Sequence, residues 1–202
     1  MQQTKPHKRY MAKHSTAKKS ASGAIRIISG KHRGRKLPVL DAQGLRPTTD
    51  RVKETLFNWL MPYIQQSDCL DCFAGAGSLA FEAHSRGASS VTLCELDKGA
   101  SRQLKSNIAL LKATNMTVHQ TDALAFLQQN ATPMDIVFID PPFRQGLATK
   151  AAQLVDSHWL KKDSLIYLEV ESELALDQLP SSWQLLKEKV AGQVAYRLFQ
   201  KG

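Results

Sequence analysis

Asp140, Pro141, Pro142 and Phe143 follow directly on the apolar run 136–139, and their side chains and backbone could hold a conjugated amine. The exocyclic amine of a nucleobase is a poor nucleophile because its lone pair is delocalised into the ring. Hydrogen bonds from the amine to the Asp140 carboxylate and the Pro141 carbonyl would localise that pair and orient the nitrogen. The two prolines fix the backbone, and Phe143 could stack on a base turned out of its helix. These four residues predict a catalytic corner for nucleobase amines, although a plain strand ending in a rigid turn has the same pattern.

A glycine turn lies earlier in the chain, where the apolar run 69–73 gives way to a helical pattern. Gly75 and Gly77 let the backbone approach a ligand, and the following helix start offers unpaired N–H groups. With Ala80 the turn also fits a dinucleotide site, and a tight structural turn is the plainer alternative. Asp71 opposes the dinucleotide, because a carboxylate repels a pyrophosphate but can receive a cationic amino-acid head. The predicted cofactor-binding residues of this turn are Asp71, Phe73, Gly75 and Gly77.

Two more carboxylates follow the next two predicted strands. Glu95 lies 18 residues beyond Gly77, at a strand tip, where it could accept hydrogen bonds from both ribose hydroxyls of an adenosine. Asp97 could take that role instead. Asp122, together with Ala123, could receive the amine of an adenine, although Asp122 is equally suited to cap the helix that follows. The pattern favours an adenosine-containing cofactor.

The charge of the chain is unevenly distributed. Residues 1–36 hold 11 Lys and Arg and no Asp or Glu, which leaves 16 bases and 18 acids in the remainder. A near-neutral body with a basic arm is typical of a catalytic domain that binds a polyanion. A solvated tail and an organelle transit peptide are the alternatives. We expect residues 1–22 to be a disordered basic tail, and residues 23–202 to form a single domain.

A basic flap is expected between the tail and the domain, at about residues 24–45. Ile25, Ile27 and Ile28 suggest a short strand, and Gly30 and Gly34 suggest turns. Cations on such a flap would contact RNA phosphates, which position a nucleic acid without specifying its sequence. The candidate RNA-contacting residues of the flap are Arg26, Lys31, Arg33, Arg35 and Lys36.

The elements that must position these residues alternate between strand and helix from residue 68 onward. Such alternation predicts an α/β fold, a Rossmann-like, mainly parallel sheet with helices on both faces. The expected strands are the apolar runs 69–73, 91–93, 116–118, 136–139 and 165–170. Two further segments, 183–190 and 194–199, flank Ala191-Gly192 and predict a C-terminal antiparallel hairpin.

A helix before the sheet is predicted from Asp50, as its cap, through Leu60 to a stop at Pro62. The odd cysteine count indicates a reducing compartment. All three cysteines should be buried thiols, with Cys69 and Cys72 on opposite strand faces. No run approaches the roughly 18 apolar residues of a membrane span, and no secretory signal is present. We therefore expect a cytoplasmic protein with no membrane partner and no metal site.

Four separated segments, in this order, resemble a known family. The glycine turn, the acidic strand tip and residues 140–143 resemble class I methyltransferases that modify exocyclic amines. Residues 44–59 (GLRPTTDRVKETLFNW) and 189–197 (KVAGQVAYR) resemble the RsmD family specifically. The resemblance covers residues 25 to 200.

The resemblance implies transfer of a methyl group from S-adenosylmethionine to the N2 of a guanine in bacterial 16S ribosomal RNA. It places the cofactor at residues 71–77 and Glu95 and the target amine at residues 140–143. It also implies that three residues lie near the mouth of the active site: Arg46, Thr48 and Arg51. We expect direct displacement with neither a metal nor a covalent enzyme intermediate. We expect the protein to be a monomer. Its expected partner is 16S RNA, in the small ribosomal subunit or an assembly intermediate.

Three alternatives stay open. Adenine N6 methylation of DNA or RNA uses the same kind of catalytic corner, although no separate domain that could read a DNA sequence is evident. A non-catalytic RNA-binding protein of ribosome assembly would need only the basic arm. A nicotinamide-dependent oxidoreductase would use the glycine turn for a dinucleotide.

Overall fold

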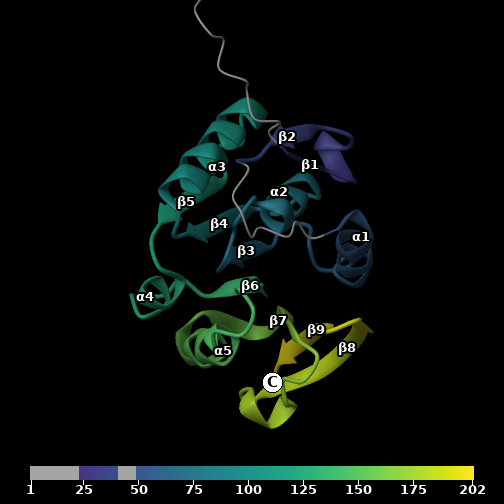
Figure 1. The fold of residues 1–202 in the computed structure, drawn as a ribbon, viewed down its shortest axis with the longest axis vertical. Helices are drawn as coiled ribbons and strands as arrows, with labels where there is room; N and C mark the ends of the chain where they lie inside the picture. Colours follow the sequence, from purple (N-terminus) through teal and green to yellow (C-terminus); the bar gives the residue numbers. More distant parts are fainter. Residues whose placement is uncertain (1–22, 41–48) are drawn as a thin grey trace, which may run out of the picture.

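The computed structural model describes residues 23–40 and 49–202. Within these ranges seven strands form one sheet in the order β5-β4-β3-β6-β7-β9-β8 (Figure 1). Strands β5, β4, β3, β6 and β7 are parallel, whereas β9 is antiparallel to both β7 and β8. The mainly parallel sheet and the C-terminal hairpin are confirmed. The strands are β3 (Asp68–Asp71), β4 (Ser90–Glu95), β5 (Met116–Gln120), β6 (Met134–Ile139), β7 (Leu160–Glu171), β8 (Trp183–Ala191) and β9 (Val194–Lys201).

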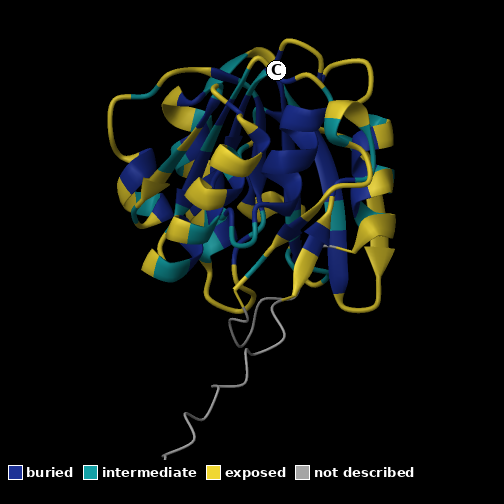
Figure 2. Cartoon of the chain, turned by 90° about the horizontal axis from the view of Figure 1, so that it is seen from above, coloured by how far each residue is buried: buried dark blue, intermediate teal, exposed yellow. Residues whose placement is uncertain are grey.

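Helices cover both faces of this sheet, as expected. Helices α1 (Asp50–Trp59), α2 (Ser78–Ser85) and α3 (Lys98–Leu111) pack on one face, and α4 (Ala123–Leu127) and α5 (Leu147–His158) pack on the other. Successive strand residues point to opposite faces. Cys69 is therefore buried under α1 to α3 and Cys72 under α4 and α5, which confirms the two buried thiols. The buried residues fill the middle of the molecule, between the sheet and its helices (Figure 2).

The connection order creates a switch point at the centre of the sheet. The chain leaves β3 toward β4 on one side, and β6 pairs with β3 on the other side. In open parallel sheets, the loops beyond the carboxyl ends of the strands diverge at such a point and leave a crevice. This geometry determines where the functional site must lie.

The basic flap forms a small antiparallel hairpin of β1 (Ala24–Arg26) and β2 (Lys36–Pro38), joined through the short helix η1 (Gly30–His32). The buried Glu82 carboxylate of α2 accepts hydrogen bonds from the backbone N–H of Ile28 at 2.9 Å and of Ser29 at 3.0 Å. Strand β1 ends at Arg26, so it is shorter than predicted and does not include Ile28. The proposed tail, 1–22, and the end of the flap, 41–45, lie outside the described residues.

The first helix begins one residue earlier than predicted. Thr49 is its N-cap, with its hydroxyl accepting from the N–H of Val52 at 3.4 Å, so the expectation of Asp50 as the cap was wrong. Asp50 is instead the first helical residue and pairs with the buried Lys53 at 3.2 Å. Both residue types cap helices well, and the sequence alone does not separate two adjacent candidates.

Strand β7 starts five residues before the predicted run, because the polar segment that precedes Leu165 also joins the sheet. The register against β6 shifts there, between Met134 and Ile136. Lys161 holds this end by pairing with Asp68 at 2.9 Å and Asp135 at 2.8 Å. Over the described part of the chain, no helix has the length and apolar character needed to cross a bilayer.

Candidate active site

A cavity of about 630 Å³ opens at the carboxyl ends of the parallel strands. This size is typical of a small-molecule site. One acidic residue from the carboxyl-terminal end region of each parallel strand lines it, and these are Asp71, Glu95, Asp122, Asp140 and Glu169. Among the described lining residues there is no Lys, Arg or His. Five carboxyl groups around one cavity favour a cationic ligand and oppose a pyrophosphate.

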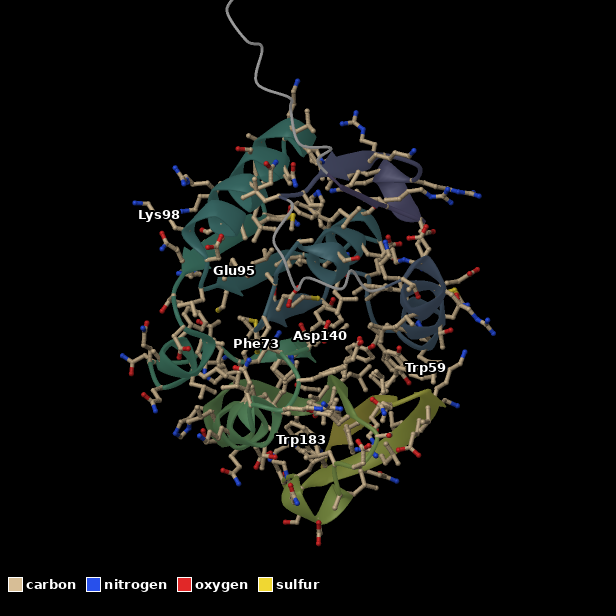
Figure 3. The ribbon with its side chains drawn as sticks, in the orientation of Figure 1. Trp59, Phe73, Glu95, Lys98, Asp140 and Trp183 are labelled. Atoms are coloured by element: carbon tan, nitrogen blue, oxygen red, sulfur yellow. The ribbon has the colours of Figure 1, made fainter. Side chains whose placement is uncertain are left out.

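The side chains that sequence reasoning singled out come together here. Phe73, Glu95 and Asp140 lie near one another in the middle of the view (Figure 3). The predicted cofactor and catalytic residues that line the cavity are Asp71, Phe73, Gly75, Glu95, Asp122, Ala123, Asp140, Pro141, Pro142 and Phe143.

Asp71 is the most deeply buried of the five acids, with 2% of its surface exposed. Burial raises the pKa of its carboxyl group to about 7, and the charge of Glu95 adds to this, although backbone N–H groups of Phe73 and Ala80 oppose it. Within the described chain its Oδ1 has no hydrogen-bond partner. Buried acceptors are normally satisfied, so an ammonium group delivered by a ligand would fit this position.

The glycine turn brings backbone into the cavity. Gly77 has φ +79° and is the N-cap of α2; a Cβ there would lie 2.6 Å from Leu104 Cδ2. It shapes the turn without lining the cavity, which the neighbouring Ser78 and Leu79 do. Only glycine fits both the left-handed conformation and the close packing.

Glu95 and Asp97, the two candidates for the ribose hydroxyls, lie in different surroundings. The Glu95 carboxylate lines the cavity and accepts hydrogen bonds from the N–H groups of Gly75 and Asp97, each at 2.7 Å. Burial is the main cause of its raised pKa, partly offset by these two bonds. Asp97 caps α3 by accepting from the N–H of Ala100 at 2.7 Å and is not among the lining residues. The geometry favours Glu95 for the ribose hydroxyls.

Asp122 caps a helix and also lines the cavity. Its Oδ1 accepts from the N–H of Ala125 at 2.9 Å and so caps α4. Together with Ala123 it also lines the cavity, beside Thr121. A carboxylate has several acceptor positions, so capping leaves room for a second donor.

The Asp140 corner begins where β6 ends at Ile139. Burial raises the pKa of Asp140 well above its ordinary value, and the charges of Glu169 and Asp71 raise it further. Phe143 lies at the rim with 36% of its surface exposed, so its ring is accessible to a base. The backbone N–H of Arg144 donates to a carboxylate oxygen of Glu171, which anchors the corner to β7.

Glu169 and Tyr196 are among the lining residues that sequence reasoning missed. They are direct partners in the pairing of β7 with β9. The Tyr167 hydroxyl donates to Glu169 Oε2 at 3.0 Å. One signal was available, because Glu169 is the only charged residue in the apolar run 165–170.

The predicted RNA-contacting residues that the structure describes do not line the cavity. All five cations of the hairpin, Arg26, Lys31, Arg33, Arg35 and Lys36, are exposed on the surface. Arg51 is exposed on α1, one residue before the lining residue Val52. Arg46 and Thr48 lie outside the described residues.

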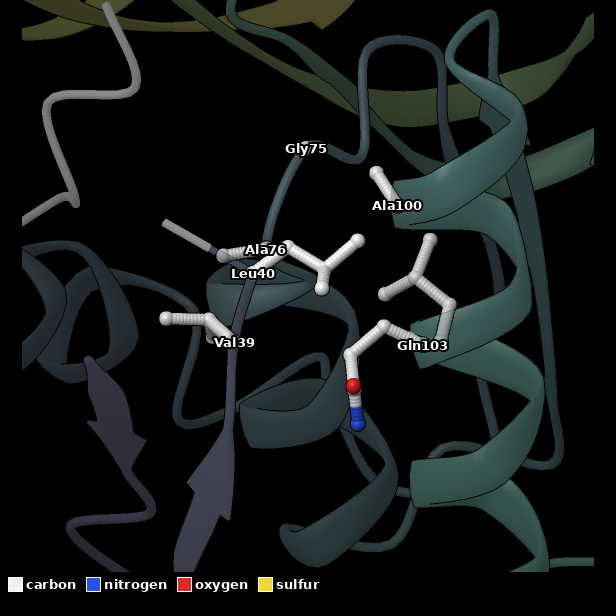
Figure 4. Close-up of a pocket in the computed structure, with 7 residues that line it drawn as sticks. Val39, Leu40, Gly75, Ala76, Ala100 and Gln103 are labelled. Carbon is white, nitrogen blue, oxygen red and sulfur yellow. The ribbon is translucent and has the colours of Figure 1, made fainter. Parts of the chain in front are cut away.

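The two residues that follow β2 contact the glycine turn. Val39 and Leu40 lie against Gly75, Ala76 and the α3 residue Gln103, around a hollow of only about 10 Å³ (Figure 4). Such a hollow is too small for a ligand and reflects packing. The basic surface and the glycine turn are therefore neighbours in the structure.

The cavity offers three kinds of polar contact to a ligand at one edge of the sheet. Asp71 suits an ammonium group, Glu95 suits a pair of hydroxyls, and the Asp140 corner suits a conjugated amine. A cofactor that combines an amino-acid head with an adenosine would satisfy the first two.

Comparisons with known proteins agree with this geometry. The family model described as "Conserved hypothetical protein 95" matches residues 25–200. "Ribosomal RNA small subunit methyltransferase D" of Escherichia coli K12 is 57% identical over 183 residues, covering 90% of this chain and 92% of that protein. Its namesake from Haemophilus influenzae Rd is 55% identical over 186 residues, covering 90% and 96%. A solved structure, "Putative methyltransferase yhhF from Escherichia coli", superposes with a TM-score of 0.84 at 54% identity, covering 89% of this chain and 98% of that chain.

Proposed function

Because the chain belongs to the RsmD family of methyltransferases, we propose that it methylates the exocyclic N2 of a specific guanine in 16S ribosomal RNA. S-adenosylmethionine is the methyl donor. One observation carries the proposal: the Asp140 corner opens into the same cavity as Asp71 and Glu95. Relatives named as small-subunit ribosomal RNA methyltransferases support the choice of RNA.

The residues that line the cavity fit S-adenosylmethionine. When bound, this cofactor supplies an electrophilic methyl group on a positively charged sulfonium. Asp71 would receive its ammonium group, because its buried Oδ1 lacks a partner within the described chain. Glu95 would hold the ribose hydroxyls through acceptor positions that the Gly75 and Asp97 amides leave available. The five carboxyl groups together stabilise the cofactor's positive charge.

The chain's own residues would prepare the guanine. The Asp140 carboxylate and the Pro141 carbonyl accept hydrogen bonds from the N2 amine, which localises its lone pair on nitrogen. Phe143, at the rim, stacks on the base and excludes water. The raised pKa of Asp140 suits a group that takes up the proton the amine loses.

The basic hairpin would bind the RNA backbone. Its exposed cations form an electrostatic surface that needs no base contact. Arg46, Thr48 and Arg51 would extend this surface to the mouth of the site. The substrate is then the small subunit or one of its assembly intermediates, and the enzyme acts as a monomer.

The proposal is tested by incubating the protein with labelled S-adenosylmethionine and small ribosomal subunits, naked 16S RNA or duplex DNA. The modified nucleoside is then identified by mass spectrometry. We expect N2-methylguanosine from a ribosomal substrate. N6-methyladenine would overturn the choice of base, and transfer to none of the substrates despite cofactor binding would favour a non-catalytic RNA-binding role.

A further inference from the structure

We infer that Glu169 selects guanine over other amine-bearing bases by accepting a hydrogen bond from the N1–H of the target base. The inference rests on the proposed function and deepens it. It concerns a residue of β7 that lies outside every motif that the sequence pointed to.

Glu169 lies beside the catalytic corner. Strands β6 and β7 are parallel, and Ile139, the last residue of β6, pairs with Leu168. Asp140 and Glu169 are the residues that follow this pair. Neighbouring strands are about 4.8 Å apart. Both carboxyl groups line the same cavity, and Glu169 is close enough that its charge raises the pKa of Asp140. Two carboxyl groups therefore face one ligand side by side.

A hydrogen bond from a buried tyrosine orients Glu169. The Tyr167 hydroxyl donates to its Oε2 at 3.0 Å, and Tyr167 itself is fully buried. Because the donor cannot move, the carboxylate is held toward the cavity before any ligand binds. Each carboxylate oxygen can accept more than one hydrogen bond, so the group retains acceptor capacity for a base.

The hydrogen-bonding edge of guanine matches two adjacent acceptors. Its N2 amine lies next to N1–H, so two donors point the same way. In adenine and cytosine the exocyclic amine lies next to a ring nitrogen that carries a lone pair. A carboxylate at that position repels the lone pair. A site built for a particular donor rejects analogues that lack it.

The test uses 2-aminopurine, which keeps the amine at position 2 but has a lone pair at N1. Once the methylated guanine is mapped, small-subunit RNA is ligated with either guanine or 2-aminopurine at that position. Methyl transfer to both RNAs is then measured with the wild-type protein and with Glu169→Gln. Glutamine keeps an oxygen that can accept from Tyr167 and adds an amide that can donate to N1.

We expect the wild-type protein to prefer guanine by about 100-fold or more in kcat/KM. Glu169→Gln should lower kcat/KM for guanine about 10- to 100-fold and raise it for 2-aminopurine. A gain on the analogue cannot come from misfolding. The control is Glu173→Gln, the same change at an exposed position just beyond β7, which should leave both values unaltered.

Two results would overturn the inference. If wild-type protein forms N2-methylguanosine but accepts 2-aminopurine equally well, or if Glu169→Gln keeps the wild-type preference, Glu169 does not read N1 while the proposed function stands. If wild-type protein forms no N2-methylguanosine on the guanine RNA, both the inference and the proposed function fail.

Discussion

The carboxylate of Glu95 accepts a hydrogen bond from the backbone N–H of Gly75 at 2.7 Å. This bond joins the tip of β4 to the glycine turn after β3. It fixes the two parts of the cofactor site relative to one another before the cofactor arrives, so less ordering is needed on binding.

Replacing Glu95 should therefore weaken cofactor binding. Glu95→Ala removes the acceptor for the ribose hydroxyls and frees the turn, and we expect the dissociation constant for S-adenosylmethionine to rise about 10- to 100-fold. Isothermal titration calorimetry measures this. Asp97→Ala is the control, because it removes the cap of α3 and should cost about 1 kcal/mol of stability without altering affinity. The reverse pattern would assign the ribose to Asp97.

Asp71 should make the ligand-free protein less stable as the pH rises. Its folded pKa of about 7 lies above the ordinary value of 3.8, so the folded state holds the proton more tightly. Stability is therefore lost between those two values, by an amount on the order of 2 to 4 kcal/mol. Asp71→Asn should raise Tm at pH 8 and abolish the stabilisation by S-adenosylmethionine, as followed by thermal denaturation.

Asp68, at the other end of β3, provides the control of opposite sign. Hydrogen bonds from Lys161 and Ser90 lower the pKa of its carboxyl group, so its ionised form stabilises the folded state. Asp68→Asn should lower Tm at pH 8 and leave the shift caused by the cofactor intact. An unaltered cofactor shift in Asp71→Asn would show that Asp71 does not bind the ammonium group.

The basic hairpin should govern RNA affinity and its salt dependence. The double variant Arg33→Glu, Arg35→Glu removes two exposed cations, and each lost phosphate contact should reduce the slope of log affinity against log salt by about 0.7 to 0.9. Filter binding to small subunits measures the slope. Lys187→Glu, Lys189→Glu on β8 is the control and should leave it unaltered. Equal effects of the two double variants would exclude the hairpin as the specific binding surface.

Much of the site could be predicted from the sequence, because most of its acidic residues lie at the carboxyl ends of parallel strands. Asp71, Glu95, Asp122 and Asp140 each follow an apolar run, and the carboxyl ends of parallel strands meet at one edge. Alternating strands and helices predicted the sheet itself. Both inferences use only local pattern and the handedness of the crossovers.

The rest depended on which strands are neighbours. Glu169 reaches the cavity because β7 pairs with β6, and Tyr196 reaches it because β9 returns antiparallel to β7. Local pattern does not contain this order. The early start of β7 could not be predicted either, because residues 161–164 are polar and include Asp163 at φ +61°. The Thr49 cap differed from the prediction by one residue, the usual uncertainty of helix ends.

The central claim is that Asp140 activates a guanine N2 for methylation, and a single-turnover measurement tests it most directly. Wild-type protein and Asp140→Ala are saturated with S-adenosylmethionine and mixed with small subunits, and N2-methylguanosine per subunit is counted over time. We predict about one per subunit for wild type and a rate at least about 10²-fold lower for the variant, with cofactor affinity retained. A normal rate in Asp140→Ala, or a methyl group on another atom in the wild-type reaction, would contradict the account.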